Sequence, residues 1–508
     1  MGGGLMQLVA YGAQDVYLTG NPQITFWKVT YRRHTNFAME SIEQTFNGQA
    51  DFGRRVTCTV SRNGDLAYRT YLQVTLPEIS TGANGANHAR WLDFPGHQLI
   101  ENVEVEVGGQ RIEKQYGDWM HIWCQLTMDK NQEAGYYKMV GNTTQLTFVT
   151  DPSFADVDGP CDSNAPRQVC APRNALPETT LYVPLQFWFC TNPGLALPLI
   201  ALQYHEVKIN LDLRAIDECL WAVDALSGGS KATNAYANSL VSASLYVDYI
   251  YLDTDERRRM AQNPHEYLIE QLQYTGAESV GSSANKIRLN FNHPVKELVW
   301  VVQPDCHVDY CASLEKDESL YSALGAQPFN YTDALDALPN SIKAFGSSAA
   351  VDGTAAFIDG DVFDEATATA SGTQSAVSDA GTFVLAETSL DMHCWGENPV
   401  VTAKLQLNGQ DRFSEREGTY FDQVQPWQHH TRAPDTGINV YSFALRPEEH
   451  QPSGTCNMSR IDNATLQLVL SNATVESTNT AKVRVYARNY NVLRIMSGMG
   501  GLAYSNKI

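Results

Sequence analysis

The segment DCHVDYC, residues 305–311, gathers two cysteines, a histidine and two aspartates. Thiolate, imidazole and carboxylate groups are the ligands that Zn²⁺ takes in proteins, so Cys306, His307, Asp309 and Cys311 form a candidate metal set. Structural zinc sites space their ligands in separated pairs, and these four residues are too crowded for that spacing. The spacing therefore favours the end of a strand that runs into a loop over a zinc site.

Two further groups of residues could bind a metal. The segment IDGDVFDE, residues 358–365, offers carboxylates to Ca²⁺, but it lacks the glycine and the twelfth-position glutamate of an EF-hand loop. A solvated acidic loop explains it better, with a weak calcium site as the alternative. His429 and His430 are adjacent, and adjacent residues of a strand face opposite ways, so they cannot easily chelate one ion. The His-x-His pair of a cupin-type metalloenzyme does not occur in the sequence.

Motifs of the common catalytic classes are missing as well. The sequence has no phosphate-binding Gly-Lys-Ser/Thr loop, no Gly-x-Ser-x-Gly nucleophile elbow and no His-Glu-x-x-His. We therefore predict no catalytic residues, no cofactor-binding residues, no metal ligands, no cofactor and no enzymatic activity.

Two basic segments could contact an anionic partner. Arg257 to Arg259 lie toward the end of a predicted helix, where they complement the helix dipole, and this explains them without a phosphate ligand. Residues 28–37, KVTYRRHTNF, are more informative because they place basic side chains among aromatic ones. An ordinary strand with one solvated face and a contact with an acidic partner or membrane surface explain this segment equally well. Its basic residues are Lys28, Arg32, Arg33 and His34.

Composition limits the possible partners and the compartment. The 508 residues carry 36 Lys and Arg against 57 Asp and Glu, a formal charge of −21, and 43% are hydrophobic. Such a chain can bury sizeable cores, and its acidic surface repels phosphate, so we expect no direct nucleic-acid binding. Ten cysteines without a Cys-x-x-Cys pair indicate reduced thiols made in a cytosol, with a late disulfide possible. The first residues show no secretory signal.

Residues 179–204 contain no charged residue and no histidine, which raises the question of a membrane span. A spanning helix needs about 20 apolar residues in sequence. Three prolines and an Asn-Pro-Gly turn interrupt this run, and the residues after it alternate between apolar and polar. We therefore predict a strand over 181–190, a turn, and a second strand over 202–213, all within the core of a soluble fold.

Short alternating strands separated by Gly, Pro and Asn turns recur along the whole chain, which is typical of all-β sandwiches or barrels. The clearest helix starts at Asp253 or Thr254 and ends at Asn263-Pro264. The two halves repeat weakly, because VEVEVGGQRIEK (103–114) resembles AKLQLNGQDRFS (403–414). This repetition predicts two similar β-sandwiches.

These signals divide the chain into an N-terminal sandwich over 1–253, an inter-domain connection over 254–273 and a C-terminal sandwich over 274–508. Residues 333–391 interrupt the second sandwich with ten acidic residues against one basic residue. We interpret 333–391 as a long, solvated acidic insertion between strands.

Several stretches resemble a known family. They run in order from end to end of the chain, and together they are similar to the major capsid proteins of nucleocytoplasmic large DNA viruses, nearest to the chlorovirus-like branch. The stretches are GGGLMQLVAYGAQDVYLTGNPQITFWKVTYRRHTNFAMESIEQTF (2–46), PLQFWFCTNPGLALPLIALQYHEVKI (184–209), YVDYIYLDTDERRRMAQNPHEYLIEQLQ (246–273), LNFNHPVKEL (289–298), LQLNGQDRF (405–413), YSFALRPEEHQPSGTCNMSRIDNATLQL (441–468) and YARNYNVLRIMSGMGGLAYSN (486–506).

The resemblance implies a double jelly roll of two eight-stranded antiparallel sandwiches with few short helices. It implies a homotrimer that forms a pseudo-hexameric capsomer and tiles an icosahedral shell, in contact with neighbouring capsomers and minor capsid proteins. The implied location is the virion, assembled in host cytoplasm, with the N-terminal segment facing the interior and the inner viral membrane. The segments 151–180 and 333–391 would fit the variable outer loops of the family.

Two other classes of function remain open from the residues alone. One is a β-sandwich carbohydrate-binding or adhesion protein that uses aromatic residues in exposed loops as sugar platforms. The other is a jelly-roll metalloenzyme, and the absence of a His-x-His pair from the sequence argues against it.

Overall fold

The computed structural model describes most of the chain. The described residues are 3–80, 88–147, 150, 175–224, 230–308, 326–334, 376–377, 383–384, 396–476 and 478–505. Asp309, Cys311 and the segment 358–365 lie outside them, as does nearly all of 151–180 and of the insertion 333–391. The interpretations given for these residues above therefore stay predictions.

The N-terminal half folds into two antiparallel sheets that face each other. The first has the strand order β1 (Phe37–Gln44), β11 (Ser242–Leu252), β3 (Leu66–Leu76), β7 (Thr179–Pro184), with β8 (Leu197–Pro198) beside β3. The second has the order β2 (Arg55–Thr59), β9 (Val207–Leu213), β5 (Ile100–Val107), β6 (Gln110–Tyr116). A separate two-stranded sheet joins β4 (His88–Trp91) to β10 (Leu220–Val223).

The C-terminal half repeats this arrangement. One sheet has the order β12 (His265–Val280), β23 (Ala481–Met496), β14 (Pro294–Pro304), β20 (Ile438–Ser442), with β21 (Cys456–Asn457) beside β14 and β24 (Met499–Leu502) beside β23. The other has the order β13 (Ala284–Leu289), β22 (Ala464–Leu470), β17 (Val400–Leu407), β18 (Gln410–Asp411), with β19 (Arg416–Glu417) beside β17. A two-residue pair, β15 (Ala376–Val377) and β16 (Phe383–Val384), stands apart.

Counting the eight main strands of each half from its start, both halves show the sheets 1-8-3-6 and 2-7-4-5. This is the strand order of a jelly roll, so the predicted fold class of two jelly rolls in tandem is confirmed. Within the described residues, no sheet contains strands from both halves.

Each sandwich has its own core, built by the alternation of its strands. Leu72, Val74 and Leu76 of β3 point into the N-terminal core, while Leu298 and Trp300 of β14 point into the C-terminal core. A third apolar cluster joins the two halves, and it contains residues of both. The described residues therefore form two sandwich cores and a buried seam between them. Smaller apolar contacts also cross between the halves, through Ile269, Leu493 and Ile495 in the N-terminal cluster and through Ala326 beside Trp221.

The uncharged run contributes to the N-terminal core, as predicted. Leu181, Val183 and Phe187 are almost completely buried there. Its local structure differs from the prediction, because the strand ends at Pro184 and Trp188–Thr191 forms the short helix α7. Proline offers no backbone donor to continue the ladder. The second predicted strand, 202–213, corresponds to β9, which starts at Val207. Among the helices that the structure describes, none is long and apolar enough to cross a membrane.

The predicted helix after Asp253 is confirmed as α8 (Thr254–Gln262). The Asp253 side chain caps it by accepting a hydrogen bond of 2.8 Å from the backbone N–H of Thr254, and Asn263 ends it. Only the first part of 254–273 is helical, since β12 begins at His265.

Further helices were not anticipated from the sequence. The two long ones are α4 (Gly117–Thr127) and α5 (Lys130–Val140). The short ones are α1 (Gly4–Leu8), α2 (Val16–Thr19), α3 (Pro95–Leu99), α6 (Thr144–Thr147), α12 (Gln425–His429) and α13 (Asn472–Val475). A π-helical turn, η6 (Tyr420–Val424), leads into α12, and single 3₁₀ turns are η1 (Pro193–Leu195), η2 (Ile216–Glu218), η3 (Ala235–Ala237), η4 (Asp305–His307) and η7 (Met458–Arg460).

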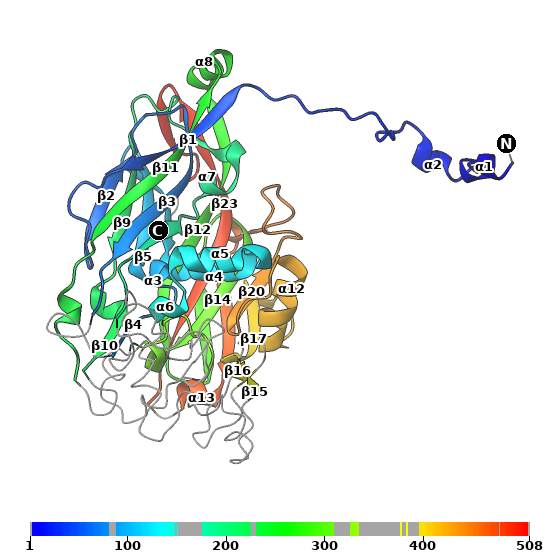
Figure 1. Ribbon diagram of the computed structural model, residues 1–508. Helices are drawn as coiled ribbons and strands as arrows, with labels where there is room; N and C mark the ends of the chain where they lie inside the picture. Colours follow the sequence, from blue (N-terminus) through cyan, green and yellow to red (C-terminus); the bar gives the residue numbers. More distant parts are fainter. Residues whose placement is uncertain are drawn as a thin grey trace, which may run out of the picture.

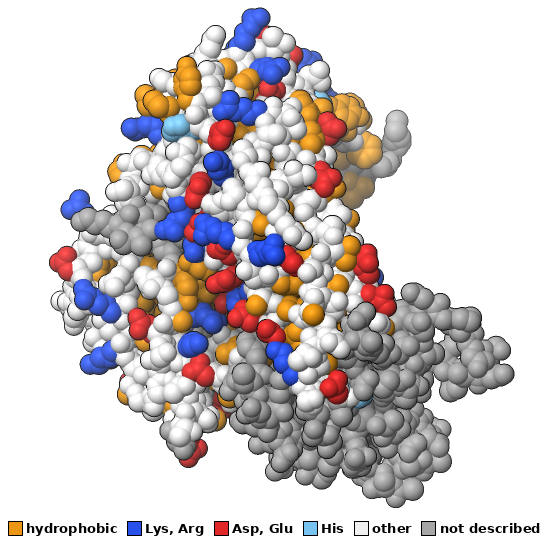
Figure 2. Space-filling view, turned by 90° about the vertical axis from the view of Figure 1, so that its left-hand side faces the viewer, with side chains coloured by type: hydrophobic (Ala, Val, Ile, Leu, Met, Phe, Trp, Pro, Cys, Tyr) orange, Lys and Arg blue, Asp and Glu red, His pale blue; other side chains and the backbone are white. Residues whose placement is uncertain are grey.

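Figure 1 shows the two sandwiches side by side, with α4 and α5 lying between them and α12 on the opposite flank of the C-terminal half. The residues before β1 form an arm that extends away from the body. On the flank that carries β2 and β9, basic and acidic side chains are interspersed (Figure 2). In the sheet β2-β9-β5-β6, the Glu104 carboxylate lies 2.8 Å from the Arg55 guanidinium and 3.3 Å from Arg111 and Lys114.

Candidate functional site

The seam between the sandwiches is the most elaborate contact in the molecule, and it is built by α4. Trp119, Ile122, Trp123 and Leu126 recur at the spacing that puts them on one face of a helix. This face packs on the outer side of the sheet β12-β23-β14-β20, together with part of the loop 326–331. The N-terminal half thus supplies the cover for a sheet of the C-terminal half.

Aromatic rings make up much of this cover. The Trp119 ring lies 5.2 Å from the ring of Tyr486 in β23, which stacks on Tyr274 of β12 at 4.8 Å. Val299 and Val301 of β14 fill the adjoining space. Such large side chains remove much apolar area from water, so the seam contributes strongly to the stability of the contact between the two sandwiches.

Local signals explain why helices form at this point of the chain. Asp118 lies in the first turn of α4, where a carboxylate is favoured by the helix dipole. Asp129 caps α5 by accepting a hydrogen bond of 3.0 Å from the Asn131 N–H, and α5 ends at Gly141, whose φ of 84° is left-handed. A side chain at Gly141 would also meet Leu181 and Pro95.

Charged residues join the halves around the aromatic seam. The Asp118 carboxylate lies 3.3 Å from both Arg214 of its own half and Arg484 of β23. Glu133 of α5 pairs with Arg432 of the C-terminal half at 2.9 Å. These ion pairs connect α4 and α5 of the N-terminal half to the C-terminal half on both sides of the aromatic contacts.

Next to the seam, the outer face of the C-terminal sheet carries a buried ionic cluster, which we define as Glu270, Lys296, Glu297, His430, Glu448 and Arg488. Glu297 is its centre: its carboxylate lies 2.9 Å from His430 Nε2 and 3.0 Å from the Arg488 guanidinium. The other imidazole nitrogen of His430 lies 2.9 Å from Glu448. Glu270 accepts from Arg488 and, at 2.7 Å, from the Lys296 ammonium.

Burial and pairing oppose each other in this cluster. Burial lowers the pKa of His430, but the carboxylates of Glu297 and Glu448 outweigh it and raise the pKa to about 9. Burial raises the pKa of Glu297, and His430 and Arg488 outweigh it and lower the pKa to about 2. Burial and the charge of Arg488 lower the pKa of Lys296 to about 8. The centre of the cluster is therefore an imidazolium–carboxylate–guanidinium group at neutral pH.

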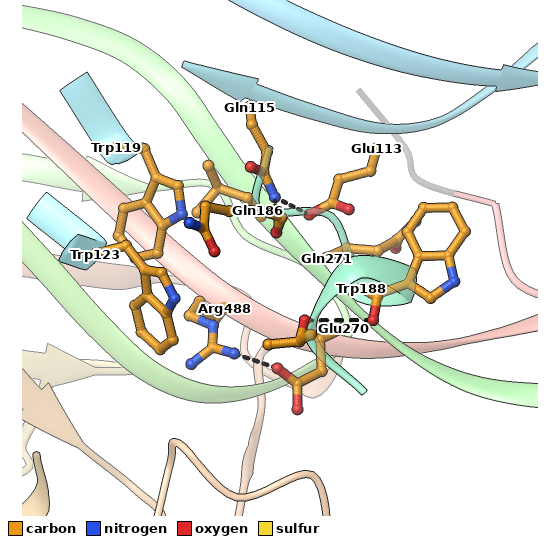
Figure 3. A pocket seen from close by; sticks show the side chains of 11 residues that line it. Glu113, Gln115, Trp119, Trp123, Gln186, Trp188, Glu270, Gln271 and Arg488 are labelled. Atoms are coloured by element: carbon orange, nitrogen blue, oxygen red, sulfur yellow. Dashed lines mark hydrogen bonds and ion pairs between the residues drawn. The ribbon is translucent and has the colours of Figure 1, made fainter. Parts of the chain in front are cut away.

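A small polar pocket lies where the cluster meets the seam. Figure 3 shows Trp119 and Trp123 on one side of it, Trp188 on the other, and Arg488 paired with Glu270. The Arg488 guanidinium lies 3.8 Å from the centre of the Trp123 ring, which is a cation–π contact. The pocket holds about 30 Å³, space for one or two waters and too little for an organic ligand.

Glu113 also lines this pocket. One oxygen of its carboxyl group accepts a hydrogen bond of 2.8 Å from the Gln115 amide, which also donates to the Gln186 carbonyl at 2.7 Å. Burial raises the pKa of Glu113 to about 8, so its carboxyl group is protonated at neutral pH. The raised pKa of this carboxyl group is explained by its burial.

The residues singled out by spacing lie apart from this seam or have other roles. Cys306 and His307 lie in η4, and His307 is buried with its Nδ1 at 2.9 Å from the Asn330 carbonyl. His430 belongs to the ionic cluster, whereas His429 contacts the Leu445 carbonyl at 3.1 Å. Within the described ranges, no group of three or more His, Cys, Asp or Glu side chains could hold a metal ion.

The two basic segments have different surroundings. Arg257 of α8 pairs with the buried Asp65 at 3.0 Å, so this residue ties the helix to the N-terminal half. Arg32 and Arg33 lie on the exposed N-terminal arm. The arm also exposes large apolar side chains, among them Phe26 at 99% and Trp27 at 84%. Sequence reasoning found the arm through its mixture of basic and aromatic residues but missed the seam and the ionic cluster.

Comparisons with known proteins agree over the whole chain. The family model described as "Major capsid protein N-terminus" matches residues 25–253, and the one described as "Large eukaryotic DNA virus major capsid protein" matches residues 256–501. The major capsid protein of Phaeocystis pouchetii virus is 77% identical, and that of Paramecium bursaria Chlorella virus 1 is 41% identical, each over 100% of both chains.

Solved structures show the same likeness. The crystal structure of PBCV-1 VP54, fitted into a reconstruction of the virophage Sputnik, matches with a TM-score of 0.63 at 35% identity. The match covers 95% of this chain and 100% of the other. A quasi-atomic model of the PBCV-1 virus capsid matches equally well.

Proposed function

Because the chain belongs to the family of large eukaryotic DNA virus major capsid proteins, we propose that three copies of it associate into a pseudo-hexameric capsomer that tiles an icosahedral shell. The chain is a structural capsid protein of the virion, and its relatives form capsomer arrays. The observation that carries the proposal is the identical strand order of the two sandwiches.

Duplication gives a physical reason for three copies. Two similar sandwiches per chain let a trimer present six similar lobes, so that one chain can cover a hexagonal lattice with threefold symmetry. Each sandwich can then diverge to suit its own neighbours. The same duplication supports two sandwich domains joined around α8. The predicted domains are 1–253 and 274–508, but the first strand of the second sandwich, β12, starts at His265, inside the predicted connection 254–273.

Sedimentation of the purified chain tests this association. We expect a species of three times 56.3 kDa at neutral pH. A chain that stays monomeric across protein concentrations and salt conditions would contradict the proposal.

We further propose that the N-terminal arm contacts partners inside the shell, either minor capsid proteins or the inner membrane. Exposed aromatic and apolar side chains along the arm support this, since side chains such as Trp27 and Tyr31 prefer an apolar or interfacial environment. Arg32 and Arg33 would add attraction to anionic lipid.

Flotation with anionic vesicles separates the two kinds of inner partner. If the membrane is the partner, the full chain binds the vesicles and a chain without residues 1–36 does not, while both sediment as trimers. Equal flotation of the two chains would contradict membrane contact by the arm.

The remaining parts of the proposal concern chemistry and place. We propose a purely structural role without enzymatic activity, without direct nucleic-acid contact, and with assembly in host cytoplasm. The buried ionic cluster supports a structural role, because its charged groups form ion pairs with one another. Detection of a specific turnover that an Arg488→Met variant abolishes, with the trimer intact, would contradict it.

A further inference from the structure

The two halves share one strand order but differ in what the helices between their strands cover. In both halves, the segment between the fifth and sixth main strands carries helices: α4 and α5 between β6 and β7, and η6 and α12 between β18 and β20. The first set covers the outer face of the sheet β12-β23-β14-β20. In the first set, the helices of one half cover a sheet of the half that follows it in the chain. The C-terminal half is followed by no further half, so η6 and α12 have no such sheet to cover within their own chain.

The corresponding sheet of the N-terminal half, β1-β11-β3-β7, is only partly covered on its outer side. At one end, Leu66, Tyr68 and Ile250 are buried in a small cluster with Ala196 and Met260. Farther along the sheet, side chains of the same face are not buried. A row of three tyrosines crosses this side: Tyr246 of β11 stacks on Tyr71 of β3 at 5.3 Å, and Tyr71 lies 6.2 Å from Tyr182 of β7. None of the three is buried, and Tyr182 is 39% exposed. The matching side of the C-terminal sheet carries Tyr274 and Tyr486 in the same kind of stack, and there α4 covers them.

The outward side of η6 and α12 exposes apolar side chains between two glutamines, Gln423 and Gln428. Trp427 is 77% exposed and Val424 is 38% exposed. Leu445, which is 75% exposed, lies beside them, because its carbonyl contacts His429 at the end of α12. Phe421, Gln425 and Pro426 point inward and are buried, so the segment is firmly held on its own half. A fixed, exposed tryptophan with apolar neighbours is the type of surface that proteins bury on association.

We propose that Trp427 and its neighbours Val424 and Leu445 dock on the tyrosine row Tyr71, Tyr182 and Tyr246 of a second copy of this chain. The contact repeats, between chains, the packing of α4 on the C-terminal sheet within one chain. It rests on the proposed trimer and specifies which surfaces form it.

The repetition also explains how the assembly closes. Each half places its helices on the sheet of the next half, which is a head-to-tail contact. Head-to-tail contacts form a closed ring when the rotations from each half to the next add up to a full turn. In such a ring, contacts within a chain alternate with contacts between chains, so the ring contains complete chains only. Tyrosine and tryptophan suit the external contact, since they bury large areas with little loss of side-chain freedom.

Photo-crosslinking from position 427 tests the proposed surfaces. We would replace Trp427 by p-benzoylphenylalanine, irradiate the trimer and identify the joined peptides. The expected products join two chains and map to β1, β3, β7 or β11. The matched control carries the same group at Tyr504, which is 62% exposed and belongs to neither surface, and should give no product with these strands. Products that map elsewhere, or none in an intact trimer, would overturn the docking.

A second variant measures the strength of the contact. Trp427→Arg should weaken trimer association at least tenfold in a sedimentation series, as expected for a central interface tryptophan. Unchanged association would overturn the docking. Because Trp427 makes no part of the apolar core, the melting of the monomer reports separately that the variant is folded. A wild-type chain that never trimerises would instead contradict the proposed function itself.

Discussion

The outer faces of the two corresponding sheets differ more than their strand orders do. On β12-β23-β14-β20, helices from the other half exclude water, and the sheet carries a buried ionic cluster beneath large aromatic rings. On β1-β11-β3-β7, the same side carries a row of tyrosines that are not buried. Duplication has therefore preserved the framework, while the residues on each face follow the neighbour that each face meets.

Charge networks show the same contrast. The Glu104 side chain is nearly buried, but its partners Arg55 and Arg111 are about half exposed. In the ionic cluster, the side chains of Glu297 and His430 are completely buried and Arg488 is only 12% exposed. A pair in water is weakened by solvent, but a buried charge that loses its partner is left without solvation. The two networks should thus respond very differently to loss of one cation.

Removal of the buried cation should give the largest effect. Arg488→Met leaves Glu297 and Glu270 with less compensation, so we expect the free energy of unfolding to fall by about 3–5 kcal/mol in a urea titration. The matched change beside Glu104, Arg55→Met, should cost less than about 1 kcal/mol. Equal losses would show that the two networks do not differ in burial as described.

The imidazole of His430 should make the free energy of unfolding fall as the pH becomes alkaline. The pKa of His430 is about 9 in the folded chain against an ordinary value of 6.5, so its contribution is complete below pH 6.5 and is lost as the pH rises through 9. We expect wild type to lose roughly 2–3 kcal/mol more than His430→Gln over this range.

The comparison between wild type and variant is needed because Glu113 and Lys296 titrate near pH 8 as well. Thermal unfolding at steps of pH measures the difference. His429→Gln serves as the control and should keep the slope of wild type. A variant curve parallel to wild type would remove His430 from the cluster.

The smallest expected effect concerns two hairpins whose turns are of the same type. Gly108-Gly109 and Asn408-Gly409 all have positive φ, as a two-residue turn of this kind requires. Gly108→Asn would place a Cβ about 2.4 Å from the His205 ring, a clash that should cost about 1–3 kcal/mol.

The reverse change at the other turn should be milder. Asn408→Gly loses hydrogen bonds to the N–H groups of Asp462 and Asn463, at 3.0 and 3.1 Å, and should cost about 1 kcal/mol. Unfolding in urea measures both variants. A larger loss for Asn408→Gly than for Gly108→Asn would contradict the view that the His205 ring requires glycine at position 108.

Much of the framework could be predicted from the sequence because strands leave a local signal. The alternation in 103–107 and 403–407 and the turns that follow identified matching hairpins, now seen as β5–β6 and β17–β18. The cap at Asp253 identified α8 in the same way. Each of these signals lies within a few residues of the element that it specifies.

The seam escaped prediction for two different reasons. The helix α4 has a local signal, the apolar spacing from Trp119 to Leu126 followed by the cap at Asp129, and this signal was overlooked. The ionic cluster has none, because Glu270, Glu297, His430 and Arg488 come from four separate segments. Only the strand order brings them together, and a single sequence does not specify that order directly.

Electron microscopy of the purified capsomer, at a resolution that shows helices, tests the central claim most directly. We expect a threefold particle with six similar lobes, in which η6 and α12 of each chain cover the sheet β1-β11-β3-β7 of the next. A trimer with that sheet face open, or a particle without threefold symmetry, would contradict it.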